Sequence, residues 1–361
     1  MAGKVSLMGS VSFGWLNQVG GFQYDERYFL DPRYRLEQDE AVNALLAERF
    51  PHDPIYNFEA HCVRWEGRLR PVALVGGIQT NLSMGAAVGG QFVFQGDKDI
   101  DITQTPLADI TDIDPLRKID WENTWPIDLL VKQIRQMCES HGDRYAIIPP
   151  FFWDTSGWAV TFGPVTTAQK LMGERVFTEM VDNPTFLHEF LDWIMESKRR
   201  LIRLFAREAG LEIAGVHLGV CSACMIGPDH FAEFILPAVN NFGEEFGPVK
   251  IHSCGLSDHL SEVFTDIKGL TCLNVGSYSS VARIREHIGN VRIDVIPDAQ
   301  LLTFGTPADI DKWTRQTVEE NGEGQLEFQY HMDLLQPVEN CLQINQTLRE
   351  LDFDCSRQDV F

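Results

Sequence analysis

Apolar residues follow two alternating patterns from about residue 127 to the end of the chain. Short apolar runs predict strands, and they are separated by longer segments whose apolar residues recur every three or four positions, as in helices. The predicted strands are 145–152, 213–221, 248–253, 270–275, 291–296 and 325–330. The predicted helices are 127–141, 184–209, 229–243, 257–267, 279–288, 306–320 and 337–351.

Two of these helices carry clear start signals. Asn183 is a good cap and Pro184 suits the first helical position, where no N–H is needed. Gly210 is a typical residue to end the same helix. Thr306 and Pro307 repeat the start signal further along the chain. The predicted boundaries therefore rest on local chemistry as well as on apolar spacing.

Strands that alternate with helices of this length predict parallel strand–helix–strand units. A doubly wound sheet would also fit, but no G-x-G-x-x-G follows any predicted strand. We therefore predict a single (β/α)8 TIM barrel over residues 1–361. Residues 1–126 lack the regular pattern and are expected to form an irregular N-terminal extension with the first barrel elements, and 127–361 the regular repeats. The active site is expected on the C-terminal face, where the strands end.

Charge excludes several partners. The 361 residues include 52 acidic and 30 basic side chains, a formal net charge of −22. Nucleic-acid binding needs clustered Lys and Arg, and an anionic membrane surface would repel this chain. No apolar run approaches the roughly 18 residues of a membrane span, and the N-terminus lacks the pattern of a signal peptide. We expect a cytoplasmic protein whose eight cysteines are buried thiols or, in a minority, metal ligands or nucleophiles.

The sharpest local feature is His252-Ser253-Cys254-Gly255 at the end of a predicted strand. Two residues apart on an extended segment, the imidazole and the thiol point to the same side, so both can reach one Zn²⁺. His331 ends the last predicted strand and would lie on the same rim of a barrel. Three protein ligands with one open position is the arrangement of a catalytic zinc. The alternative is a hydrogen-bonded histidine beside a buried thiol.

Cys221-Ser222-Ala223-Cys224 also ends a predicted strand. A C-x-x-C pair can be a redox motif or half of a zinc site, but no second pair and no thioredoxin-like context is present. We interpret Cys224 as structural. Cys221 is a candidate pocket residue or a further metal ligand.

Two loops are candidates for substrate binding. Trp153, Asp154 and Trp158 place two indoles around a carboxylate, which suits a flat apolar ligand with a polar handle, although a packed loop would look the same. Gln79 and Asn81 follow a pair of glycines and either contact a ligand or form a turn. The chain has no G-x-S-x-G, H-E-x-x-H or phosphate-binding loop, so those hydrolase and nucleotide chemistries are not expected.

Three stretches carry a family resemblance: Pro228-Asp229-His230-Phe231, the H-S-C-G at 252–255, and Gln336-Pro337-Val338-Glu339-Asn340. With them, residues 184–351 resemble the uroporphyrinogen decarboxylase-like superfamily, and the H-x-C-G resembles its corrinoid-linked zinc methyltransferase branch. Segments 31–33 and 75–79 are similar to the members that demethylate methoxylated aromatics.

The resemblance implies a zinc site. Thiol-methylating members bind zinc through a His, a Cys two later, and a Cys before the final helix. The first two carry over onto His252 and Cys254, and His331 occupies the third position. Imidazole in place of thiolate makes the site less negative and the zinc a stronger Lewis acid. This favours polarising an ether oxygen over activating a thiol.

The implied function is zinc-dependent transfer of a methyl group from a small methylated substrate, a methoxylated aromatic, to the cobalt of a separate corrinoid protein. A corrinoid-binding D-x-H-x-x-G is absent, so the corrinoid is expected from that partner. The alternatives are methylation of a thiol such as coenzyme M, a decarboxylase-like lyase, and a non-catalytic ligand-binding barrel. Tetrapyrrole decarboxylation is disfavoured because residues 1–50 lack the arginine-rich motif of the decarboxylase. Oligomeric state stays open.

Overall fold

The computed structural model describes residues 5–57, 64–65, 68–69, 71–103, 105–153 and 156–355. Its main feature is an eight-stranded sheet with the order β2-β1-β14-β13-β12-β11-β10-β9. Every neighbouring pair in this sheet is parallel. Its strands are β1 (Val5–Val11), β2 (Ile55–Asn57), β9 (Trp158–Phe162), β10 (Gly215–Gly219), β11 (Val249–Ser253), β12 (Leu270–Val275), β13 (Arg292–Val295) and β14 (Leu326–Met332).

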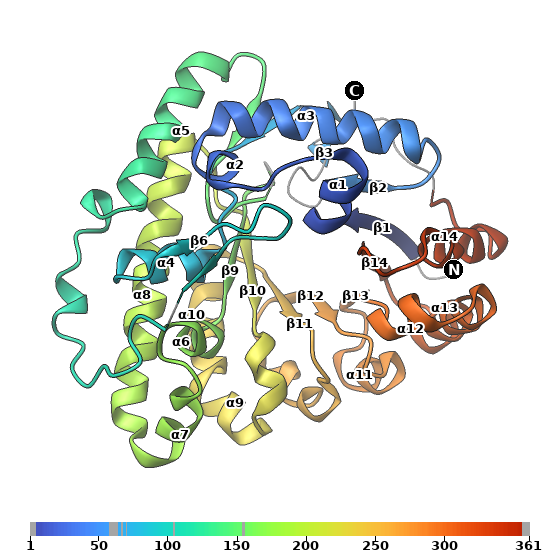
Figure 1. The fold of residues 1–361 in the computed structure, drawn as a ribbon. Coiled ribbons are helices and arrows are strands. Elements are labelled where there is room, and N and C mark those ends of the chain that lie inside the picture. Colours follow the sequence, from blue (N-terminus) through green and yellow to red (C-terminus); the bar gives the residue numbers. More distant parts are fainter. Residues whose placement is uncertain are drawn as a thin grey trace.

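The sheet curls, and the helices lie on its outside (Figure 1). A parallel pair, β5 (Val72–Leu74) with β8 (Ala146–Ile148), is joined to β9 by one antiparallel bridge between Phe152 and Ala159. Two small antiparallel pairs lie outside this sheet: β3 (Arg64–Trp65) with β4 (Arg68–Leu69), and β6 (Phe92–Val93) with β7 (Asp101–Ile102). The arrangement confirms the predicted (β/α)8-type barrel.

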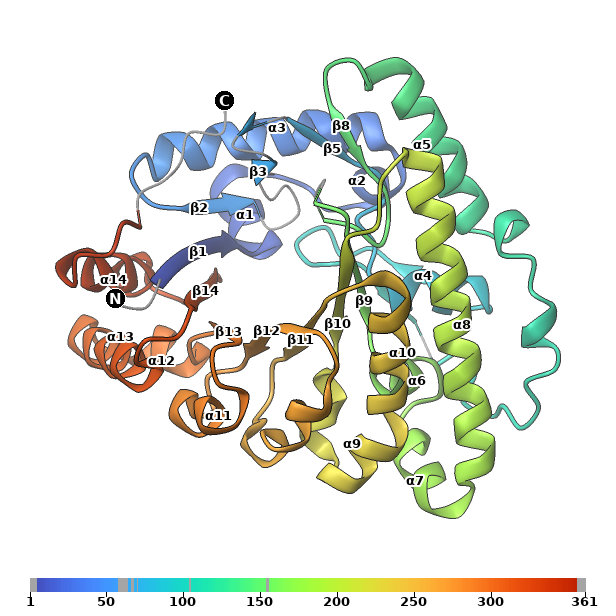
Figure 2. The ribbon, with the colours of Figure 1, turned by 180° about the vertical axis from the view of Figure 1, so that it is seen from behind.

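Helices also lie outside the sheet when the molecule is seen from behind (Figure 2). They are α1 (Phe13–Gly20), α2 (Glu26–Leu30), α3 (Pro32–Arg49), α4 (Thr80–Ala87), α5 (Ile127–His141), α6 (Pro164–Met172), α7 (Arg175–Asp182), α8 (Pro184–Ala209), α9 (Pro228–Phe234), α10 (Leu236–Phe246), α11 (Val281–Ile288), α12 (Ala299–Phe304), α13 (Pro307–Asn321) and α14 (Val338–Glu350). The 3-10 helices are η1 (Leu116–Lys118), η2 (Trp121–Asn123), η3 (Cys221–Met225), η4 (Asp258–Leu260) and η5 (Val263–Asp266). Across the part of the chain that the structure describes, no helix is both long and apolar enough to cross a membrane.

The predicted helix starts are confirmed. The Asn183 side chain accepts from the N–H of Phe186, and Gly210 ends α8 in the left-handed conformation at φ 66°. Thr306 forms a full capping box with Asp309 at the start of α13. Helices α5 and α8 have the predicted bounds. Caps could be recognised in the sequence because they depend only on residues within one turn.

The N-terminal third is more regular than its sequence indicated. β1 pairs with β14 along its whole length and so forms part of the barrel wall, and α3 runs for 18 residues. The first barrel elements expected in this region are present as β1 and β2, whereas its expected irregularity is wrong for these strands and for α3. The buried face of α3 includes Arg35, Gln38 and Asp39, and these polar residues hide the apolar stripe by which a helix is usually recognised.

Three other predictions change. The predicted strand 145–152 is the shorter β8, after which the chain turns and returns as β9, which the sequence analysis missed. The predicted helix 257–267 is two 3-10 turns, η4 and η5. The predicted helix 229–243 is divided at Ile235 into α9 and α10, because Pro237 cannot continue a helix. Helices α6, α7 and α12 were not predicted.

Side chains that face the barrel interior are only partly buried. In β11 the outward-facing Val249 and Ile251 are inaccessible to solvent, whereas Lys250 and His252, which alternate with them, are half-buried. β9 and β14 alternate in the same way. The interior of most such barrels is a packed core. Here the inner wall is partly accessible to solvent.

Candidate metal centre

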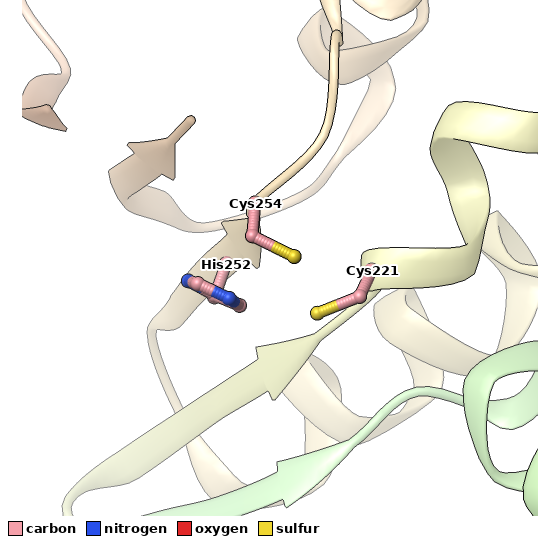
Figure 3. A group of neighbouring side chains, drawn as sticks. All are labelled: Cys221, His252 and Cys254. Carbon is pink, nitrogen blue, oxygen red and sulfur yellow. The ribbon is translucent and has the colours of Figure 1, made fainter. Parts of the chain in front are cut away.

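Three side chains meet where β10 and β11 end. Cys221 is the first residue of η3, His252 lies in β11 and Cys254 follows that strand directly. One ligand atom from each lies within 4.8 Å of the other two, and the three converge in Figure 3. Among the described residues this is the one group of three or more such side chains with this geometry. We call it the Cys–His–Cys cluster.

Close backbone packing brings the three side chains together. The Val220 N–H donates to the His252 carbonyl at 2.7 Å, which joins the ends of β10 and β11. A Cβ at Gly255 would lie 2.6 Å from the Cys224 sulfur, and one at Gly276 would lie 1.9 Å from the Cys254 carbonyl oxygen. Both positions therefore need glycine. Cys224 is not one of the three; its thiol donates to the Cys221 carbonyl at 3.1 Å.

The two cluster thiols differ in acidity. A hydrogen bond from the Cys254 thiol lowers the pKa of Cys221, and the same interaction raises the pKa of Cys254 to about 12. The Cys221 thiol therefore loses its proton more readily, whereas the Cys254 thiol keeps the proton that it donates to Cys221. A metal ion must displace that remaining proton, so binding at this cluster releases protons and strengthens with pH.

Behind His252 a polar network crosses the inner wall from β11 to β14. His252 Nδ1 contacts Asn274 Oδ1, and Asn274 Nδ2 donates to Gln329 Oε1 at 3.0 Å. The network continues to Arg292, Asp294 and Glu327. Since Nδ1 is occupied by Asn274, the nitrogen of His252 left for a metal is Nε2.

His331 lies outside the cluster. Its Nδ1 hydrogen-bonds Ser10 Oγ at 2.9 Å, across the register pair that joins β14 to β1. It shares the inner face of β14 with Gln329, two residues earlier. Burial lowers the pKa of His331, which favours the neutral imidazole that a metal requires. The structure places Cys221, rather than His331, in the cluster, and a ligand role for His331 stays a prediction.

The predicted substrate loops lie in different places. Trp158 begins β9 and pairs with Gly215, four positions before the Gly219–His252 pair, so it lies near the N-terminal end of the barrel. The ring of Trp153 contacts that of His217 at 6.0 Å. Trp158 thus lies toward the N-terminal end of the barrel and Trp153 beside the middle of β10, and substrate binding by either tryptophan stays a prediction.

The remaining predicted substrate residues are Gln79, Asn81 and Asp154. Gln79 lies after β5 at the start of α4 and donates to Asp99 at 2.8 Å. Asn81 is buried in the first turn of α4, and its Oδ1 accepts from the N–H of Leu82 at 2.9 Å. Asp154 lies outside the described residues.

Several residues of the inner wall were missed by sequence reasoning. A Cβ at Gly215 would lie 2.9 Å from the Trp158 ring and one at Gly219 would lie 3.0 Å from the Phe162 ring, so both rings lean over β10 into the interior. His217, which the sequence had placed inside a strand as a satisfied interior histidine, lies between these glycines, and burial lowers its pKa to about 3. Asn274 was also missed. Alternation within β9 and β12 was the available signal, but β9 itself had not been predicted.

A family model described as uroporphyrinogen decarboxylase (URO-D) matches residues 80–328. The chain belongs to the uroporphyrinogen decarboxylase family. The matched region runs from α4 into β14 and contains the whole Cys–His–Cys cluster, but it ends before His331.

A solved structure described as a methyltransferase from Methanosarcina mazei has a similar fold, with a TM-score of 0.65. It is 16% identical in sequence, and the match covers 97% of this chain and 94% of that one. The search of curated proteins found no match to this chain. The likeness at this identity establishes the barrel fold over nearly the full length.

Proposed function

We propose that this member of the uroporphyrinogen decarboxylase family is a zinc-dependent methyltransferase. The observation that carries the proposal is the Cys–His–Cys cluster at the C-terminal ends of β10 and β11, where barrel enzymes place their chemistry. Two sulfurs and one imidazole nitrogen are the donors that Zn²⁺ prefers. Bound there by three residues, zinc would supply Lewis-acid polarisation of a substrate atom at an open fourth position.

A methoxylated aromatic is the substrate that the inner wall supports best. Below the cluster, the rings of Phe162, His217 and Trp158 succeed one another along β9 and β10. Such a wall suits the flat face of an aromatic ligand. The methyl group would pass from the ether oxygen to a reduced corrinoid, and the electron pair of the broken C–O bond would stay on the phenolate. The corrinoid would arrive on a separate protein docked over the open rim.

Methylation of a thiol is the second candidate, and the cluster itself favours it. An ether substrate is favoured where His331 replaces a thiolate as a zinc ligand, but the cluster contains Cys221 as a second sulfur. Two thiolates make the bound zinc more electron-rich and a weaker Lewis acid, as thiol activation requires. The donor set and the aromatic wall therefore point to different substrates, and the reaction must be tested with both.

The test uses the zinc-loaded chain with free cob(I)alamin in place of the partner protein. With a methoxybenzoate we expect a phenol product and the spectrum of methylcobalamin, and a fall of about 100-fold or more in rate for His252→Ala. The variant Cys138→Ser, at a half-buried cysteine on α5, is the control. Methylation of coenzyme M by methylcobalamin, without phenol release, would support the second candidate. Absence of both reactions would contradict the proposal.

Lys250 gives a test of substrate class. Its ammonium nitrogen lies 4.1 Å from the centre of the Trp158 ring, two residues below His252 on the inner face of β11. Among the described residues no carboxylate pairs with it. A substrate carboxylate could therefore bind there while the methoxy end faces the cluster.

We expect Lys250→Met to raise KM about 10-fold for a methoxybenzoate and to leave KM unchanged for the corresponding neutral methoxybenzamide. Initial rates with both substrates measure this difference. An equal change for both would show that Lys250 supports the wall without binding a carboxylate.

A further inference from the structure

The contact between His252 and Asn274 links the cluster to the neighbouring strand. The two residues are register partners on β11 and β12, and Asn274 is only 4% exposed. A histidine Nδ1 donates in one tautomer and accepts in the other. Which atom of Asn274 faces the ring therefore decides which nitrogen of His252 carries the proton. The oxygen and nitrogen of an amide have almost the same shape, so their placement must follow from their other partners.

The far end of the network fixes those partners. Gln329 Nε2 lies 2.8 Å from Glu327 Oε1 and 3.1 Å from Asp294 Oδ2. An ionised carboxylate can only accept, so the NH2 group of Gln329 must face these two oxygens. Arg292 forms ion pairs with both carboxylates, at 2.5 Å each. Burial raises the pKa of Asp294, and the Arg292 guanidinium opposes that shift.

Glu327 is the firmer of the two anchors. Its Oε1 accepts from Arg292 as well as from Gln329, and its Oε2 accepts from Ser6 Oγ at 2.9 Å. Phe328 packs outward against Trp313 of α13, with ring centres 5.5 Å apart, so the neighbouring Glu327 and Gln329 both face inward. The direction of the Gln329 amide is thus set by a charged group on its own strand.

The direction is then transmitted along the network. With its NH2 group on the carboxylates, Gln329 presents Oε1 to Asn274, whose Nδ2 donates to it at 3.0 Å. Asn274 must therefore turn Oδ1 toward His252, where it can only accept. His252 consequently carries its proton on Nδ1 and keeps a lone pair on Nε2, the nitrogen that remains for the cluster.

We propose that Asn274 and Gln329 are positioning residues that hold His252 in the tautomer able to bind the metal. The inference rests on the metal site of the proposed function, but not on the substrate or the methyl transfer. Partners of this kind fix the ring orientation and tautomer of metal-bound histidines, and losing them weakens metal binding about 10–100-fold. The unusual feature here is that the deciding charges lie two side chains away from the ligand.

The tautomer is read directly by ¹⁵N NMR of histidine-labelled, metal-free protein, with no substrate or corrinoid present. In the wild type we expect His252 to be protonated on Nδ1. In Asn274→Leu, and also in Gln329→Leu, which does not touch His252, we expect a mixture of tautomers. Zinc affinity, measured by competition with a chromophoric chelator, should fall about 10–100-fold in both. Asn274→Asp keeps an acceptor oxygen toward Nδ1 and should retain the wild-type tautomer.

The matched control is Asn345→Leu. Asn345 is a fully buried asparagine on α14 that hydrogen-bonds Tyr330 and Asp53, away from His252. It should leave both the tautomer and the zinc affinity unchanged. The proposal is overturned if wild-type His252 is protonated on Nε2, or if both leucine variants keep the wild-type tautomer and affinity. If a leucine variant does not fold, the wild-type spectrum alone decides. Failure of methyl transfer with the tautomer as expected would reject only the proposed function.

Discussion

Replacing Cys254 by serine should remove bound zinc from the protein. We expect about one zinc per chain in the wild type and near zero in Cys254→Ser after dialysis. Zinc affinity should fall by more than about 100-fold, which is the largest loss typical of residues that only support the metal ligands. The physical reason is that a serine hydroxyl is a poor zinc ligand at neutral pH, whereas a thiolate is a strong one. Cys254 also shares its proton with Cys221, so the substitution changes both sulfurs of the cluster.

Elemental analysis together with chelator competition measures the effect. Cys138→Ser is the matched control because Cys138 is also incompletely buried but lies on α5, away from the cluster. It should bind zinc like the wild type. Cys221→Ser should behave like Cys254→Ser, whereas His331→Ala distinguishes the two possible third ligands. Zinc retained in Cys221→Ser and lost in His331→Ala would restore the ligand set expected from the sequence.

Adding a single methyl group at Gly276 should both destabilise the protein and weaken its metal site. The new Cβ would lie 1.9 Å from the carbonyl oxygen of Cys254, and backbone cannot yield as a flexible side chain can. The Gly276 N–H also donates to the Ser253 carbonyl at 3.0 Å. Because the new Cβ needs more room, the loop after β12 must move away from the Ser253–Cys254 segment and weaken this hydrogen bond. We expect Gly276→Ala to cost about 2–3 kcal/mol of unfolding free energy. Zinc affinity should fall at least about 10-fold, because Cys254 moves with the displaced backbone.

Urea denaturation and zinc competition give the two quantities. Gly227→Ala is the control: a Cβ there meets no atom within 4 Å, and the residue has an ordinary φ of −76°. Gly227→Ala should cost no more than about 1 kcal/mol of unfolding free energy, because Gly227 is the N-cap of α9 and alanine is a poorer cap than glycine. A Gly276→Ala protein as stable as the wild type would show that the β12 loop and the Cys254 segment are not as tightly packed as described.

Local signals in the sequence determined much of the fold. The cap at Asn183, the proline after it and the glycine at 210 act within one turn, and α8 begins and ends where they indicate. Apolar runs separated by helical spacing gave five of the parallel strands on the C-terminal side, and hence the barrel. The same reasoning located His252 and Cys254 at a strand end, because residues two apart on a strand share a face.

Only the tertiary structure decided which residues join that pair. His331 and Cys221 both end strands, and in a barrel all such ends lie on one rim, so the sequence could not choose between them. The choice depends on strand order: β10 is the direct neighbour of β11, whereas β14 is three strands away. Strand order results from contacts far apart in the chain, which leave no local pattern.

The polar inner wall shows the same limit. Asn274, Gln329 and Glu327 are unremarkable as single residues, and their meaning lies in hydrogen bonds between β12 and β14, which are 55 residues apart at the closest contact. Likewise β1 completes the barrel by pairing with β14 at the other end of the chain. The sequence by itself thus determined most of the elements after residue 184 and two of the three cluster residues. The packing of distant strands decided the rest, because side-chain partners across a sheet are set by register and not by spacing.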